Sequence, residues 1–369
     1  MKNSKTKKIL SILLAVIMVV GMIPATVIPA SAANSATIAT EYDHLVNELV
    51  IDGEETIILT DNPNNETFLS ALSFQSDINI KGSGKLTIKI NVDDADGISS
   101  VTAISSEKSI TISESVQIVI DIENYNTSAD ATGISAVSGI YIKDSASVDI
   151  NIYSVNENYP CLGINTGRGE ISIDGDGTKN INISCPFGGI CINNYANDSS
   201  SNYNELTKNN GDITIKGTGK VTLKNENKGT GIEVAEGVYN TDGTILIAGD
   251  VQILGCTDYG IRNLSAERES SEADIIVSDA ILDIHSSNNG IGSRANGIRF
   301  NNSDITIVAS INAINLKFPY YQYAYNESDY GLDITGGGKV YLKSLNYSAI
   351  VTNYDSEKST GPVCDFDLL

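Results

Sequence analysis

The chain of 369 residues carries 46 acidic and 24 basic residues, a formal net charge of −22 at pH 7, and 41% of its residues are hydrophobic. This apolar content is enough to build a core, which excludes an acidic disordered tail. An acidic surface repels nucleic acid phosphates and anionic membranes, so the charge argues against both as partners.

The N-terminus has the three parts of a secretory signal peptide. Four lysines within the first eight residues precede an apolar run from Ile9 to Val20, and Ala30-Ser31-Ala32 follows as a small-residue cleavage site. Pro24 and Pro29 argue against a membrane anchor, which needs about 20 unbroken apolar residues. We therefore predict a signal peptide over residues 1–32 and a secreted, extracellular protein, with retention at the cell surface left open. Removal of the signal peptide leaves 20 basic and 46 acidic residues, a net charge of −26.

Residues 33–76 are predicted to form an N-terminal cap, because the open end of a strand stack invites edge pairing. A repeat begins after this segment. Short strands of alternating pattern recur about every 30 residues through the rest of the chain, residues 77–369. They start at the following positions: Ile78, Ile110, Ile140, Ile171, Ile213, Ile245, Ile275, Ile298 and Leu332.

Each repeat contains two further strands. A turn, often rich in glycine as in Lys81–Lys85, leads to a second alternating strand such as Leu86–Ile88. A polar loop then leads to a third anchor, usually Gly-Ile. We place this anchor at Gly97-Ile98, Gly133-Ile134, Gly163-Ile164, Gly189-Ile190, Gly231-Ile232, Gly260-Ile261 and Gly290-Ile291, with Ala313-Ile314 and Ala349-Ile350 in the last two repeats.

Three strands per repeat predict an all-β fold, a single-stranded parallel β-helix (β-solenoid) of about nine three-strand rungs. Alternation points the aliphatic side chains inward and the polar ones outward. Successive coils pair in parallel, and parallel crossovers favour a right-handed path. A sandwich or propeller would need antiparallel hairpins at shorter spacing.

Two units, Ile78–Ile88 and Ile213–Leu223, are followed by Asp-Gly-Ile and Thr-Gly-Ile respectively. In this pattern the chain resembles the carbohydrate-binding β-helix domains of clostridial secreted proteins over about residues 77–350. The resemblance implies a pectate-lyase-like fold, calcium binding, and binding of cellulose or acidic sugars without cleavage. It carries over no individual binding residue.

No catalytic residue is predicted. The chain has two histidines, His44 and His285, and the motif Asn240–Gly243 is typical of a turn. A calcium-dependent polysaccharide lyase stays open as an alternative. Such an enzyme needs a basic residue to take a proton from the sugar. Arg262 and Arg294 follow third-strand anchors and are the candidates for that role.

Calcium is the one cofactor that the sequence indicates. Asp93, Asp94 and Asp96 lie in one loop, and stacking would place Glu123 and Asp130 of the next coil above them, with Glu157 one coil further. Clustered carboxylates are what Ca²⁺ requires. The alternative is a solvated acidic loop.

Tyrosine supplies 17 of the aromatic residues, against 6 phenylalanines and no tryptophan. The densest group is Tyr320, Tyr321, Tyr323 and Tyr325. A tyrosine ring offers an apolar face to a sugar and a hydroxyl for hydrogen bonds. These four residues are the predicted ligand site, with a clasp over the end of the solenoid as the alternative.

Five cysteines without a CxxC pair do not make a disulfide scaffold. We interpret them as small core residues, with one or two local bridges left open. Together these features predict a non-catalytic, secreted, monomeric protein that binds plant cell-wall or acidic polysaccharide. The alternatives are a structural or adhesin segment and the lyase.

Overall fold

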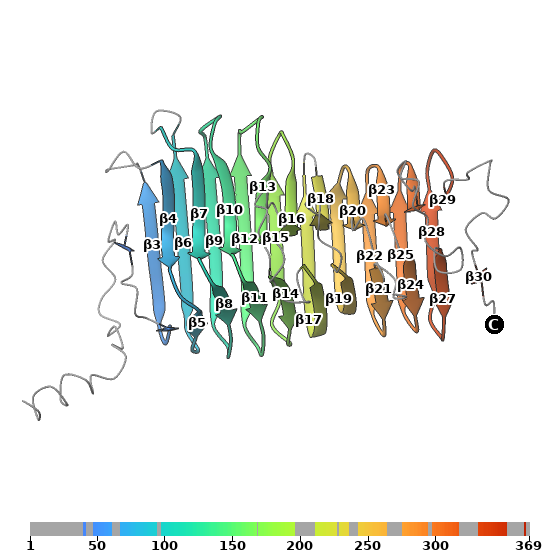
Figure 1. The fold of residues 1–369 in the computed structure, drawn as a ribbon, viewed down its shortest axis with the longest axis horizontal. Coiled ribbons are helices and arrows are strands. Elements are labelled where there is room, and N and C mark those ends of the chain that lie inside the picture. Colours follow the sequence, from blue (N-terminus) through green and yellow to red (C-terminus); the bar gives the residue numbers. More distant parts are fainter. Residues whose placement is uncertain are drawn as a thin grey trace, which may run out of the picture.

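The computed structural model describes residues 40–41, 47–60, 67–93, 97–167, 169–195, 211–226, 229–235, 243–263, 275–293, 297–316, 331–352 and 365–366. Every regular element in these ranges is a strand, and successive coils stack along one axis (Figure 1). Across the same ranges, no helix has the length and apolarity to cross a bilayer.

Each coil contributes three strands, and each strand pairs in parallel with its equivalent one coil later. The first strands are β2 (Glu48–Val50), β5 (Ile78–Lys81), β8 (Ser109–Ile112), β11 (Gly139–Ile142), β14 (Glu170–Asp174), β21 (Ile275–Ser278), β24 (Ile298–Asn301), β27 (Leu332–Thr335) and β30 (Asp365–Phe366). The second strands are β3 (Glu54–Thr60), β6 (Lys85–Val92), β9 (Gln117–Asn124), β12 (Ser147–Ser154), β15 (Lys179–Ser184), β22 (Ile281–Ser286), β25 (Asp304–Ala309) and β28 (Val340–Ser344).

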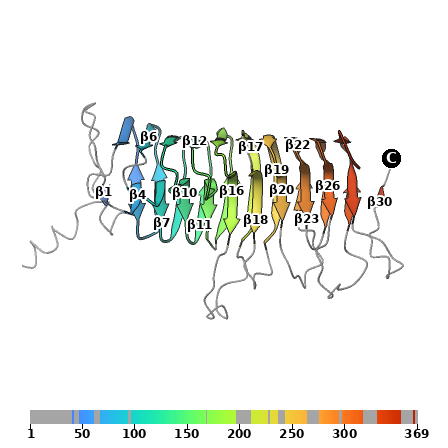
Figure 2. The same ribbon diagram turned by 90° about the horizontal axis from the view of Figure 1, so that it is seen from above.

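Two long strands, β17 (Ile213–Asn225) and β19 (Ile245–Cys256), supply both the first and the second strand of their coils. The third strands form a separate eleven-stranded sheet, which Figure 2 shows running along the axis. They are β1 (Thr40–Glu41), β4 (Phe68–Phe74), β7 (Ser100–Ser106), β10 (Asp130–Ala136), β13 (Cys161–Thr166), β16 (Gly189–Tyr195), β18 (Gly229–Ala235), β20 (Tyr259–Asn263), β23 (Asn289–Ser293), β26 (Asn312–Leu316) and β29 (Ile350–Thr352).

The predicted parallel β-solenoid is confirmed. Equivalent aliphatic residues stack in register, as Ile110, Ile140 and Ile171 do, and all three are fully buried. The number of coils differs slightly from nine, because β2, β3 and β4 form a coil before the first predicted one. These strands lie within residues 33–76, the segment predicted as a cap.

Two of the predicted third-strand anchors were placed wrongly. Ile134 pairs with Ile104 and Ile164, and Ile164 pairs with Ile192. The anchors are therefore Ala103-Ile104 and Cys191-Ile192, rather than Gly97-Ile98 and Gly189-Ile190. The physical requirement is a small residue, which alanine and cysteine meet as well as glycine does.

The reason for this requirement is close packing between coils. A Cβ on Gly133 would lie 2.6 Å from the carbonyl oxygen of Gly163 and 2.8 Å from a methyl carbon of Ile150. On Gly290 it would lie 2.2 Å from a methyl carbon of Ile307. Third-strand glycines thus provide space, whereas several glycines of the turn between the first and second strands provide left-handed backbone.

Candidate functional site

Most of the predicted site residues lie outside the described residues. This is so for Tyr320, Tyr321, Tyr323 and Tyr325, the predicted ligand site, and for Asp94 and Asp96 of the predicted calcium site. Asp93 is described, and its exposed side chain directly follows β6.

Two of the acidic residues that stacking was predicted to place above the Asp93 loop lie on different strands. Glu123 is near the end of β9, whereas Asp130 starts β10 on the far side of the intervening turn. Burial raises the pKa of Asp130, and its Oδ1 atom is buried without a hydrogen-bond partner. Within the described part of the chain, no three acidic, histidine or cysteine side chains form a group that could hold a metal ion.

Exposed aromatic side chains gather instead at the turn between the second and third strands, which we call the second corner. Tyr125, Tyr153, Tyr159 and Phe187 are 41%, 45%, 55% and 47% exposed. The rings of Tyr125 and Tyr153 lie with their centroids 5.7 Å apart at an interplanar angle of 55°. We call these four residues the aromatic corner. They come from three successive coils, those of β9, β12 and β15.

Carboxylates surround the first of these rings. The Tyr125 hydroxyl donates a hydrogen bond to Glu123 at 3.4 Å. The negative charge of Glu123 raises the pKa of Tyr125, with smaller contributions from burial, Tyr153 and Asp93. The surface around Tyr125 is therefore anionic.

Buried asparagines hold the backbone of this corner. The Asn156 amide nitrogen donates to the carbonyl of Ala129, and its oxygen accepts from the backbone N–H groups of Asn158 and Tyr159 at 2.7 and 3.1 Å. One coil earlier, Asn126 bonds to the carbonyl of Ile98 and the N–H of Ser128 in the same way. Since both asparagines are almost fully buried, these bonds fix the turns that carry the tyrosines.

Polar side chains cover the second strands of the same coils. Asp121, Asn151 and Asn182 are in register on β9, β12 and β15, and Asn151 donates to Asp121 at 3.1 Å. The Asn182 amide oxygen is buried without a partner. Such amide and carboxylate groups match the hydroxyls of a sugar.

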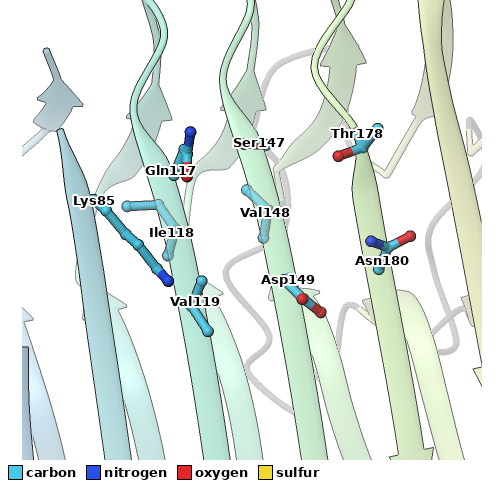
Figure 3. A pocket seen from close by; sticks show the side chains of 9 residues that line it. All are labelled: Lys85, Gln117, Ile118, Val119, Ser147, Val148, Asp149, Thr178 and Asn180. Carbon is cyan, nitrogen blue, oxygen red and sulfur yellow. The ribbon is translucent and has the colours of Figure 1, made fainter. Parts of the chain in front are cut away.

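Nearer the start of these strands the surface is hollowed (Figure 3). The hollow has a volume of about 160 Å³, and Lys85, Gln117, Asp149 and Asn180 line it from four successive strands. Burial raises the pKa of Asp149, as does the charge of Asp121, whereas Lys85 lowers it. Pockets that enclose small ligands measure roughly 300–1,000 Å³, so this hollow suits one group of a larger molecule.

The described residues that were considered for catalysis contact carboxylates of their own coil. His285 Nε2 lies 3.0 Å from Asp283 on β22, and Arg262 lies 3.4 Å from Asp258. The Arg262 guanidinium also lies over the Tyr259 ring, 5.2 Å from its centroid. Arg294, the second lyase candidate, lies outside the described residues.

The density of tyrosines in the sequence does not indicate the aromatic corner. Tyr125 and Tyr153 are 28 residues apart, as are Tyr159 and Phe187. This separation is close to one coil, so aromatic residues spaced by the repeat were the signal that could have found the corner.

The coils define the class of the molecule: it is a parallel β-helix protein with a polar and aromatic surface along one set of strands. Comparison of the chain with protein families, curated proteins and solved structures found no match.

Proposed function

We propose that the protein is a non-catalytic carbohydrate-binding protein that binds a polysaccharide along the second strands β9, β12 and β15. The observation that carries the proposal is the aromatic corner. Exposed aromatic rings of a soluble protein mark a binding surface, and here they adjoin a polar face of amides and carboxylates. The resemblance of the repeats to carbohydrate-binding β-helix domains of clostridial secreted proteins supports the same function.

The charge of the surface favours an uncharged glycan over an acidic one. The sequence of the corner segments, residues 91–96, 121–130, 151–160 and 184–188, has no lysine or arginine. Glu123 and Asp93 lie beside Tyr125, where they would repel the carboxylates of a polyuronate. A neutral plant cell-wall polymer such as a cellulose derivative or xylan avoids this repulsion.

A calcium ion that bridges a carboxylate of the protein and a carboxylate of the glycan would reverse this preference for a neutral polymer. We propose Asp93, Asp94 and Asp96 as the residues that bind the ion. The predicted signal peptide supports an extracellular location, and we propose that the protein acts there as a monomer. An extracellular protein contacts a cell-wall polymer without crossing a membrane.

Native affinity electrophoresis tests the proposal. We expect a gel containing hydroxyethyl cellulose or xylan to retard the purified protein, and a pectate gel to retard it less. Replacing both Tyr125 and Tyr153 by alanine should weaken the retardation by roughly tenfold, the loss expected when two rings that contact the sugar are removed. The control is Tyr341→Ala, which removes an exposed tyrosine from a second strand far along the axis.

Three results would contradict the proposal. Equal mobility in every gel would instead favour a structural or adhesin segment. Unsaturated products released from pectate in calcium would identify a lyase. Loss of binding on replacing Tyr321 and Tyr323, but not Tyr125 and Tyr153, would move the site to the loop predicted from the sequence.

A further inference from the structure

Four cysteines are described, and all four are buried with free thiols. Two of them lie at the second corner. Cys161 opens β13, and Cys185 directly follows β15 in the next coil. The backbone N–H of Cys161 donates to the carbonyl of Gly188 at 3.0 Å, which brings the segment around Cys185 against the start of β13.

The Cys185 thiol donates to the carbonyl oxygens of Asn156 and Tyr159 at 3.7 and 3.8 Å, which places it beside Cys161, and the two thiol groups interact. Their interaction lowers the pKa of Cys185 and raises that of Cys161. Backbone N–H groups of Gly188 and Phe187 also lower the pKa of Cys185. A thiolate is the form that attacks a disulfide.

The other two cysteines differ in this respect. Burial raises the pKa of Cys191 well above its ordinary value and that of Cys256 to about 12. Both keep their protons at neutral pH, and neither forms a side-chain hydrogen bond to another thiol among the described residues.

We propose that Cys161 and Cys185 form a disulfide when the protein folds in an oxidising compartment. The Cys185 thiolate attacks one sulfur of an oxidant disulfide such as oxidised glutathione, and a glutathione thiolate leaves. The Cys161 sulfur, after losing its proton, attacks the mixed disulfide and displaces the second glutathione. Two protein thiols are oxidised, and one glutathione disulfide is reduced to two thiols.

The bond would anchor the aromatic corner. The Cys185 sulfur lies 3.7 Å from the carbonyl oxygen of Asn156 and 3.8 Å from that of Tyr159. A bond from Cys185 to Cys161 ties the turn that carries Tyr159 to the turn that carries Phe187, across the boundary between two coils. This crosslink does not depend on glycan binding.

Peptide mapping tests the crosslink. The protein is refolded in a glutathione redox buffer, denatured in an alkylating reagent without reductant, and digested with trypsin and chymotrypsin. Trypsin cleaves after Arg168 and Lys179, and chymotrypsin cleaves after Phe187, so Cys161, Cys185 and Cys191 fall in separate peptides. We expect one linked pair containing Cys161 and Cys185, with Cys191 and Cys256 alkylated.

Variants make the result decisive. Cys256→Ser should keep the linked peptide, whereas Cys185→Ser should lose it and leave Cys161 alkylated. Oxidation should raise the melting temperature by roughly 5 °C, and a Cys161→Ala, Cys185→Ala double variant should melt at one temperature in both buffers. Alkylation of both Cys161 and Cys185 in oxidised protein, or a link between any other pair, would overturn the proposal.

Discussion

The two corners that flank each second strand are built differently. At the first corner, between the first and second strands, most of the described coils have a position with left-handed backbone. It is occupied by glycine in some coils, as at Gly175 and Gly217, and by Glu114, Asp144 or Asn302 in others. At the second corner, buried side-chain amides hold the turn and aromatic rings face solvent.

The comparison shows where the fold leaves room for function. The first corner is defined by backbone conformation and by close contact between coils, so its side chains are restricted to small or locally tolerated types. The second corner is defined by internal hydrogen bonds, so its outward residues are free to vary. Binding residues on this protein are therefore expected at the second corner.

The strand between the corners should be the most sensitive part of the coil. Ile150→Asp places an unpaired carboxylate at a fully buried position and should cost more than about 4 kcal/mol of unfolding free energy. Ile215→Asp, at a buried position in the first-strand half of β17, should have a similar effect. Urea denaturation monitored by circular dichroism measures the loss, and outward Thr222→Asp, which has no carboxylate as its register partner, is the control. A normal midpoint for Ile150→Asp would contradict the observed register.

At the second corner, Asn156→Ala should cost roughly 2–3 kcal/mol, because a fully buried amide loses its hydrogen bonds to the carbonyl of Ala129 and to the N–H groups of Asn158 and Tyr159. The exposed neighbour Asn158→Ala should change stability by a few tenths of that amount. The same urea titration compares the two variants. Similar losses in both would show that the buried amide does not hold this corner.

At the first corner, Gly175→Ala should cost about 2 kcal/mol. Its φ is 140°, and a Cβ there would lie 1.9 Å from the carbonyl oxygen of Asp144. Gly249 is the matched control, since it occupies the equivalent position but a Cβ would lie 3.1 Å from its nearest atom. Thermal melting of both alanine variants should show the larger drop for position 175.

The smallest effect concerns Lys179, which begins β15 in register with Val148 and Val221 and is almost fully buried. Burial lowers its pKa below 10.5, although Asp176 and Asp174 oppose the shift. As pH falls below 10.5, the unfolded chain takes up this proton first, so the folded state loses stability until its own pKa is reached.

Lys179→Met removes the buried amine and the loss of stability that its lowered pKa causes, so it should stabilise the protein by about 1 kcal/mol at pH 7. The difference between the variant and the parent should narrow as pH rises towards 10.5. Urea midpoints measured from pH 7 to pH 10.5 test this trend. A constant difference would show that the buried amine keeps its ordinary pKa.

Much of the fold could be predicted, because every coil has the same physical requirement, the burial of alternating aliphatic side chains. Alternating aliphatic residues at a spacing of about 30 indicate three strands per coil, and Ile110, Ile140 and Ile171 stack as that pattern requires. The third strand was harder, since both residues of its anchor are buried and simple alternation fails there. A search for Gly-Ile pairs then missed Ala103-Ile104 and Cys191-Ile192.

The candidate site could not be predicted in the same way. Outward residues obey no packing rule that a single sequence reveals, so the density of tyrosines indicates the loop with Tyr320 and Tyr325 but does not indicate the pair Tyr125 and Tyr153. Whether two outward side chains meet depends on the length of each turn and on the register between coils.

The sequence alone determined that this chain is a β-solenoid with an aliphatic interior, because burial of every second residue is written locally in each strand. Only the tertiary structure decided that Tyr125 lies beside Tyr153 and that Cys161 contacts Cys185. These pairs are 28 and 24 residues apart. Their meeting follows from the stacking of whole coils, which no short segment of sequence encodes.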